Sequence, residues 1–293
     1  MYPAPFDYHR PDDIADALAL LDSHGDDARI LAGGFSLIPA MKLRMMQPAH
    51  LIDIGGIDIL KGVRIENDAL SIGAMTTHWE IESSPLVAEW FPALAQAAGV
   101  IADAQVRNCG TIGGSLAYSD PSADYPALIL ALNARLVTIS LHGGNVIDAM
   151  NWQQGLLTTA LEPGEILIDI RFPKPPARTG SAYIKIPHPA SRFAVIGVAV
   201  SVTLGEDGKA RDLRIGVTGT STTACRALAM EQALEGHNLT RDAVEAASHL
   251  ADEGIEFNDD QLLSAGDRAY LCRTTAREAV LAAWARARNK ASA

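Results

Sequence analysis

The chain has 293 residues, of which 48% are hydrophobic and 20% are charged, and its formal net charge is −11 at pH 7. This composition is typical of a globular protein with enough apolar material for two domains, or for one large domain with an appendage. The negative charge disfavours binding to nucleic acid or to an anionic membrane surface. No segment approaches the roughly 20 apolar residues of a membrane-spanning helix, and residues 1–10 lack the apolar core of a signal peptide. We therefore expect a cytoplasmic protein.

The first part of the chain, residues 1–55, has the pattern of a small α/β unit. Apolar residues at helical spacing predict a helix over residues 12–24, and a second helix is expected over residues 37–46. Two short apolar runs, residues 29–32 and 51–54, predict strands that each end at a pair of glycines.

The middle of the chain mixes strands and helices. Alternating residues predict a hairpin over 63–72 with its turn at Asn67-Asp68, and apolar spacing predicts helices near 79–81 and over 87–98. A polar, glycine-rich segment runs from residue 108 to residue 124. A further helix at 127–132 and strands at 136–139 and 166–172 complete this part.

Three prolines within residues 173–180 predict a boundary, after which the pattern changes. Strands are expected first and helices last. The strands are 183–186, 194–204 and 213–217, with a hairpin turn at Asp207-Gly208, and the helices are 222–235, 241–253 and 267–288. We therefore predict an α+β fold made of residues 1–55, residues 56–175 and a C-terminal domain of residues 176–293.

The cysteines and histidines show no metal-ligand spacing. Cys109, Cys225 and Cys272 are too few and too far apart for a four-cysteine iron–sulfur cluster, and the last two are expected to be small buried residues. No two of the eight histidines are separated as ligands in a metal motif, so no metal site is predicted.

The most specific chemical signal is a pair of glycine loops, Ala32–Leu37 and Thr111–Ser115. In each, two adjacent glycines and nearby hydroxyl groups leave the backbone exposed, and the first loop lies between a predicted strand and a predicted helix. Backbone N–H groups in such a place bind phosphate. One Gly-Gly pair is more often only a tight turn, whereas two similar loops favour a dinucleotide whose pyrophosphate is held from both sides. Neither loop is a GxGxxG or a P-loop motif.

Longer runs around these loops resemble the two flavin motifs of the FAD-binding medium subunits of molybdenum hydroxylases, the carbon monoxide, xanthine and nicotine dehydrogenase type. The first motif spans Ala32–Pro39, Met41–Arg44 and Leu51–Ile54, and the second spans Arg107–Leu116, Asp120-Pro121 and Asp124–Ala127. The first departs from the family pattern at Phe35, where Gln or Thr is common. This departure affects a side-chain hydrogen bond and not the backbone contacts.

The resemblance implies a two-lobed FAD-binding domain of the vanillyl-alcohol-oxidase-like type. It also implies a set of FAD-binding residues: Ala32, Gly33, Gly34, Phe35, Ser36, Leu37, Thr111, Ile112, Gly113, Gly114, Ser115, Asp124, Lys185 and Phe193. Asp124 would lie near the flavin or its ribityl chain, Lys185 near the isoalloxazine ring, and Phe193 against the ring face. From the residues alone, Asp124 is equally a solvated turn or helix-start residue and Lys185 a lysine on the wet face of a strand, while Phe193 is most simply a core residue.

The resemblance further implies that the chain is a subunit of a larger enzyme. It would pass electrons from a partner's [2Fe–2S] cluster through FAD to an external acceptor, while a large subunit with molybdopterin oxidises the substrate. The expected assembly contains a small iron–sulfur subunit and the large subunit, arranged as a dimer of heterotrimers. Two alternatives remain open: a self-contained FAD-dependent oxidase or reductase, and a non-catalytic nucleotide-binding assembly protein.

Overall fold

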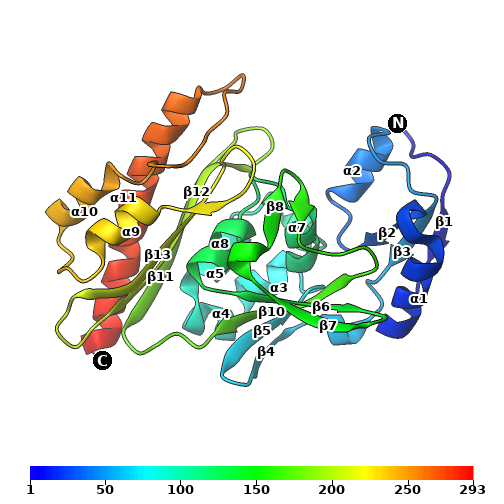
Figure 1. Ribbon diagram of the computed structural model, residues 1–293, viewed down its shortest axis with the longest axis horizontal. Coiled ribbons are helices and arrows are strands. Elements are labelled where there is room, and N and C mark those ends of the chain that lie inside the picture. Colours follow the sequence, from blue (N-terminus) through cyan, green and yellow to red (C-terminus); the bar gives the residue numbers. More distant parts are fainter. Residues whose placement is uncertain (293) are drawn as a thin grey trace.

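The computed structural model describes residues 1–292, and Figure 1 shows them as three α/β layers side by side. The first contains a parallel sheet of order β1-β3-β2, with β3 in the centre. Its elements are β1 (Asp7–His9), α1 (Ile14–His24), a 3-10 turn η1 (Gly25–Asp27), β2 (Ala28–Leu31), α2 (Leu37–Lys42) and β3 (His50–Asp53). The predicted order of this part is confirmed, although α2 ends before residue 46 because Arg44 adopts a positive φ of 62°.

The second layer is an antiparallel five-stranded sheet of order β4-β5-β10-β6-β7. Its strands are β4 (Val63–Glu66), β5 (Ala69–Gly73), β6 (Arg135–Ser140), β7 (Gly143–Asp148) and β10 (Ile166–Pro173). The hairpin turn lies at Asn67 and Asp68 as predicted, and both residues have positive φ. Strand β7 escapes prediction because it is polar and almost wholly exposed, so it has no apolar alternation.

Short helices cover this sheet and form the largest apolar core, which includes the fully buried Trp152, Tyr125 and Phe172. The remaining elements of this layer are η2 (Asp58–Leu60), α3 (His78–Ser83), α4 (Pro85–Trp90), α5 (Pro92–Gly99), α6 (Ala104–Arg107), α7 (Ile112–Tyr118), α8 (Tyr125–Ala131), η3 (Ala149–Asn151), β8 (Gln153–Gly155) and β9 (Thr158–Thr159). The helix predicted over residues 87–98 is divided at Phe91, since Pro92 cannot continue the hydrogen-bond ladder.

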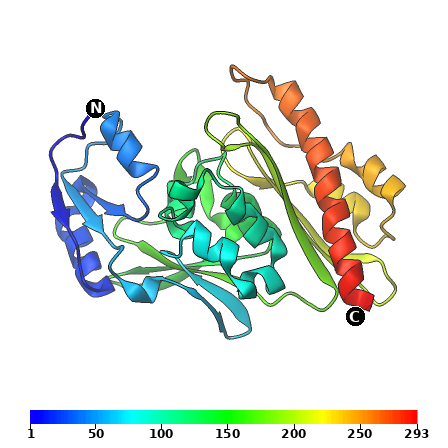
Figure 2. The same ribbon diagram turned by 180° about the vertical axis from the view of Figure 1, so that it is seen from behind.

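The C-terminal layer is an antiparallel sheet of order β11-β12-β13-β14 with helices on both faces. It comprises β11 (Thr179–Pro187), β12 (Ala194–Leu204), β13 (Ala210–Thr218), β14 (Cys225–Arg226), α9 (Leu228–Leu234), α10 (Arg241–Ser248) and α11 (Ala265–Ser292). Figure 2 shows α11 lying along β11 and β12. The helix predicted from residue 222 begins only at Leu228, because residues 225–226 pair with β13 instead.

Helix α8 joins this sheet to the middle layer. A Cβ at Gly216 of β13 would lie 2.1 Å from the carbonyl oxygen of Ala127, so only glycine permits this approach. On the other face, a Cβ at Gly180 would lie 2.1 Å from the carbonyl oxygen of Ala283 in α11. None of the helices in residues 1–292 combines the length and apolarity needed to cross a bilayer.

Candidate cofactor-binding site

The first glycine loop leaves β2 and enters α2, as the sequence predicts. Gly34 has a φ of +79°, which turns the chain between these elements. Within the described residues, the N–H groups of residues 33–36 donate to no protein acceptor. Ser36 flanks the helix without capping it through its side chain. The loop therefore presents four consecutive backbone donors and a hydroxyl group.

The second glycine motif is not the open loop that the sequence suggests. Residues 112–115 form the first turn of α7, and Thr111 is its N-cap. Their N–H groups donate to the carbonyl oxygens of Thr76 and Ala74 and to the hydroxyl and carbonyl oxygens of Thr111, at 2.8–3.1 Å. The expectation that these amides are available to a phosphate is wrong, since each is already used by the protein.

The two glycine motifs nevertheless meet. A Cβ at Gly33 would lie 2.5 Å from the carbonyl oxygen of Cys109, and one at Gly114 would lie 3.2 Å from Ala32 Cβ. The loops are thus packed backbone against backbone beside a cavity of about 440 Å³. The cavity is lined by Ala32, Gly33, Gly55, Lys61, Met75, Thr77, Trp79, Glu80, Asn108, Cys109 and Thr111.

The buried His78 is hydrogen-bonded to the second motif. The backbone N–H of His78 donates to the carbonyl oxygen of Gly110 at 2.9 Å, and its Nδ1 lies 3.0 Å from the Tyr125 hydroxyl. Burial, with a smaller effect from Arg107, lowers the pKa of His78 to about 4. The imidazole is therefore neutral at pH 7 and serves as a packed hydrogen-bonding group.

Asp124 and Lys185 contact each other across the junction with the C-terminal sheet. Lys185 Nζ lies 2.9 Å from the Asp124 carboxylate, which also accepts a 2.6 Å hydrogen bond from the Tyr183 hydroxyl. Both charged side chains are about 95% buried. Burial raises the pKa of Asp124, and the lysine and tyrosine partly oppose this effect. The structure thus pairs two predicted site residues that are 61 positions apart.

Two predicted aromatic residues are exposed, Phe35 at 46% and Phe193 at 42%. Phe35 belongs to the first loop, and Phe193 belongs to the loop that joins β11 to β12. That loop is closed by a hydrogen bond from the N–H of His188 to the carbonyl oxygen of Phe193. Because its side chain is exposed, Phe193 is not the core residue that an aromatic residue type alone would favour. Leu37 is half-buried at the start of α2, whereas Ile112 is fully buried.

Several cavity residues have no signal in the sequence. Lys61 provides a cation beside the first loop, where sequence inspection shows no basic cluster, and it pairs with Asp58 at 2.8 Å. Trp79 lines the cavity with half of its surface exposed. Both come from segments between the two motifs, so only the fold brings them to the site. Elsewhere, His9, His24 and His50 converge within the first layer, although their spacing in the sequence predicts no metal site.

Comparison with known proteins identifies the family. Residues 4–175 match the FAD binding domain in molybdopterin dehydrogenase, and residues 181–283 match the CO dehydrogenase flavoprotein C-terminal domain. The chain belongs to this family. It is an FAD-binding medium subunit of the molybdenum hydroxylase type and hence part of an oxidoreductase.

The similarity to individual members of the family extends over almost the whole chain. The chain is 40% identical to the carbon monoxide dehydrogenase medium chain of Hydrogenophaga pseudoflava, covering 98% of this chain and 99% of that one. It is 36% identical to the 6-hydroxypseudooxynicotine dehydrogenase complex subunit alpha of Paenarthrobacter nicotinovorans, covering 98% and 97%. A solved structure of carbon monoxide dehydrogenase from H. pseudoflava superimposes with a TM-score of 0.93 at 42% identity, covering 98% and 99%.

Proposed function

We propose that this flavoprotein subunit binds FAD across its two glycine motifs and passes electrons from a partner's [2Fe–2S] cluster to an external acceptor. The observation that carries the proposal is the run of N–H groups at residues 33–36 that find no protein acceptor among residues 1–292, set against the second motif beside a cavity. Such a run of donors suits the oxygens of a pyrophosphate. A side chain at Gly33 would collide with the backbone of Cys109 and Gly110, so the bare glycine is what lets the two motifs approach each other beside the cavity.

The two motifs would bind the pyrophosphate in different ways. The first would donate hydrogen bonds from its backbone and from Ser36, with the exposed Phe35 and the half-buried Leu37 flanking these donors and Lys61 offsetting the negative charge. The second, from Thr111 to Ser115, would act as a close-packed wall that sets the width of the site. FAD, once bound, supplies the redox chemistry, because it can exchange both one and two electrons.

The remaining predicted residues would act at the other end of an extended FAD, as in the two-lobed vanillyl-alcohol-oxidase-like arrangement. We divide the chain accordingly into lobes of residues 1–55 and 56–175 and a C-terminal domain of residues 176–293. Phe193 is exposed on its loop and available to cover a flavin face. Asp124 and Lys185 neutralise each other, so their influence on the flavin would depend on the pair rather than on either charge alone.

The chain would need partners to complete an enzyme. Its three cysteines are fewer than the four thiolate ligands of a usual [2Fe–2S] cluster. The relatives are described as a medium chain and as a subunit of a dehydrogenase complex. We infer a small iron–sulfur subunit and a large molybdopterin subunit, assembled as a cytoplasmic dimer of heterotrimers.

The test is the identity and amount of flavin. Heat-released supernatant of the reconstituted chain should contain one FAD per chain, and Gly33→Val should abolish this binding because its side chain would collide with the Cys109 carbonyl. FMN alone, or no flavin, would contradict the proposal. Coexpression with neighbouring genes should yield a three-subunit complex. A chain that purifies alone and rapidly oxidises a small substrate would instead support a self-contained oxidase.

A further inference from the structure

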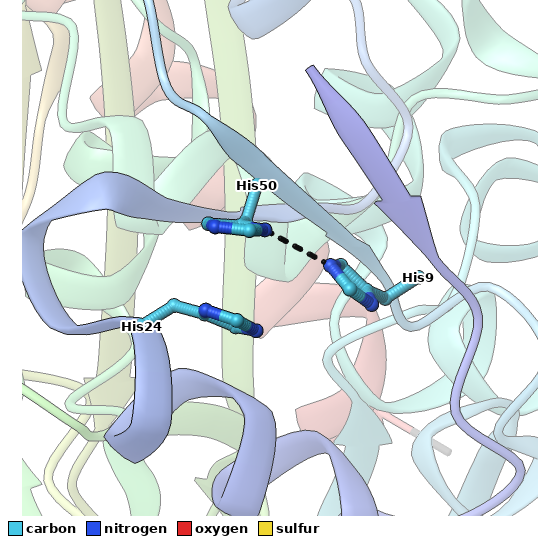
Figure 3. Close-up of side chains that lie close together, drawn as sticks. All are labelled: His9, His24 and His50. Atoms are coloured by element: carbon cyan, nitrogen blue, oxygen red, sulfur yellow. Dashed lines mark hydrogen bonds between the residues drawn. The ribbon is translucent and has the colours of Figure 1, made fainter.

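Three histidines from separate elements meet in the first lobe (Figure 3). His9 ends β1, His24 ends α1 and His50 begins β3. One nitrogen from each ring lies within 4.8 Å of the others, and all three residues are half-buried. No other group of three or more potential metal-binding side chains comes this close within residues 1–292.

Ring nitrogens of the three histidines approach one another, although the stacked rings of His24 and His50 must tilt apart before both can direct an in-plane lone pair at one ion. His9 Nε2 lies 3.1 Å from His50 Nδ1, and the rings of His24 and His50 are stacked with centroids 3.7 Å apart. Two nitrogens bound to one tetrahedral Zn²⁺ at about 2.0–2.1 Å are separated by roughly 3.3 Å, close to the observed spacing. A metal ion would require the protons on the outer nitrogens, His9 Nδ1 and His50 Nε2.

The chemistry of the cluster selects the kind of cation. Three neutral imidazoles suit Zn²⁺ and its neighbours among the first-row transition metals, whereas Mg²⁺ and Ca²⁺ prefer oxygen ligands. A carboxylate is also near, since Asp7 Oδ2 lies 3.9 Å from His50 Nδ1, and its side chain is 80% exposed and thus free to turn. Asp7 or water would complete a four-coordinate site.

The surroundings offer both access and separation from the cofactor. A surface cavity of about 470 Å³ is lined partly by His9, Arg10 and Asp16, so the His9 side of the cluster is open to solvent. His50 pairs with Ala28 at the start of β2, whereas the phosphate-binding loop follows the other end of that strand. The cluster therefore lies roughly one strand length from the glycine motifs.

We propose that His9, His24 and His50 form a binding site for one divalent transition metal ion, with Zn²⁺ as the best match, which ties β1 and α1 to the central strand β3. Strand β1 is three residues long and lies at the edge of its sheet, so a cross-link of this kind would hold the N-terminal segment in place. The metal would be structural and would make no contact with FAD.

The test uses the full-length chain without an affinity tag, loaded with FAD and freed of metal by a chelator. Equilibrium dialysis should give about one Zn²⁺ per chain. Co²⁺ should produce the intense visible absorption of a tetrahedral nitrogen-ligated site. His9→Gln and His24→Gln should each weaken Zn²⁺ binding at least roughly 100-fold, and both variants should keep wild-type FAD content.

Two matched control variants distinguish this site from nonspecific metal binding by other side chains. His142→Gln removes an exposed histidine in the middle layer, and Cys109→Ser removes an exposed thiol, so neither should change the Zn²⁺ affinity. Substoichiometric binding, an octahedral Co²⁺ spectrum, or equal affinity in the wild type and His24→Gln would each overturn the proposal. Because flavin content is measured separately, these results do not depend on whether the FAD proposal holds.

Discussion

The two glycine motifs have similar composition but use their backbones differently. Residues 33–36 leave four N–H groups without a protein acceptor among the described residues, whereas residues 112–115 commit theirs to Thr76, Ala74 and Thr111. The first motif is a turn that Gly34 makes possible with its positive φ, and the second is a helix start packed against a neighbouring strand end. A Gly-Gly pair therefore shows that side chains are excluded, but it does not reveal whether a ligand or the protein occupies the space.

Among the variants that test this contrast, Gly113→Ala is expected to have the largest effect, a loss of folding stability. The added Cβ would lie 2.5 Å from both Cβ and the carbonyl oxygen of Ala74, which is backbone and cannot turn away. We expect the free energy of unfolding to fall by about 3 kcal/mol or more. Urea denaturation measures this free energy, and Gly155→Ala, whose added Cβ would meet only Thr158 Cβ at an ordinary 4.0 Å, should change it little. A stable variant that only loses FAD would show that the second motif serves the ligand after all.

The pH dependence of stability tests the support beneath the second motif. The pKa of His78 is about 4 in the folded protein, against an ordinary value of 6.5. As pH falls below 6.5, His78 becomes protonated in the unfolded chain but stays neutral in the folded chain until about pH 4. The free energy of unfolding therefore decreases between pH 6.5 and pH 4. The contribution of His78 to this loss of unfolding free energy between pH 7 and pH 5 is about 2 kcal/mol. His78→Gln should remove it, whereas His142→Gln should not. Equal slopes in all three proteins would contradict burial of a neutral imidazole.

In the first motif, a glycine substitution should chiefly lower the affinity for FAD. Gly34→Ala forces a side chain onto a φ of +79°, at a cost of about 1–2 kcal/mol, and the loop can relieve this strain by giving up the alignment of its N–H groups. We expect the dissociation constant of FAD to rise roughly tenfold, as fluorescence titration would show. Gly208→Ala is the matched control, because Gly208 has a φ of +78° in a distant hairpin. It should lower stability similarly and leave FAD affinity unchanged. A loss of affinity in both variants would point to a global effect.

Local patterns predict much of the fold. Strand β12 has the predicted bounds, Ala194–Leu204, because an apolar segment buried on both faces is unmistakable in the sequence. Helix α7 has no signal in the sequence, since its two glycines have low helix propensity and its stability comes from the Thr111 cap and the contact with Ala74. Tertiary packing overrides propensity there.

The candidate site divides in the same way. Both glycine motifs can be found from composition and order, because the chemistry of a bare backbone is local. The pairing of Asp124 with Lys185 and the meeting of His9 with His50 cannot, since they depend on how separate elements pack. The specific flavin contacts of Asp124, Lys185 and Phe193 stay predictions.

The smallest expected effect offers the most direct comparison of the motifs, because each carries one serine with no side-chain hydrogen bond to another described residue. Ser36→Ala should raise the dissociation constant of FAD roughly fivefold, about 1 kcal/mol, as one hydrogen bond to a charged phosphate oxygen is lost. Ser115→Ala should change it less, because the second motif is proposed to act through packing. Neither change should alter the free energy of unfolding, since both hydroxyls are only half-buried. If Ser115→Ala weakens FAD binding more than Ser36→Ala, the phosphate lies principally against α7. The second motif would then supply the hydrogen-bond donors, and the first motif would act through packing.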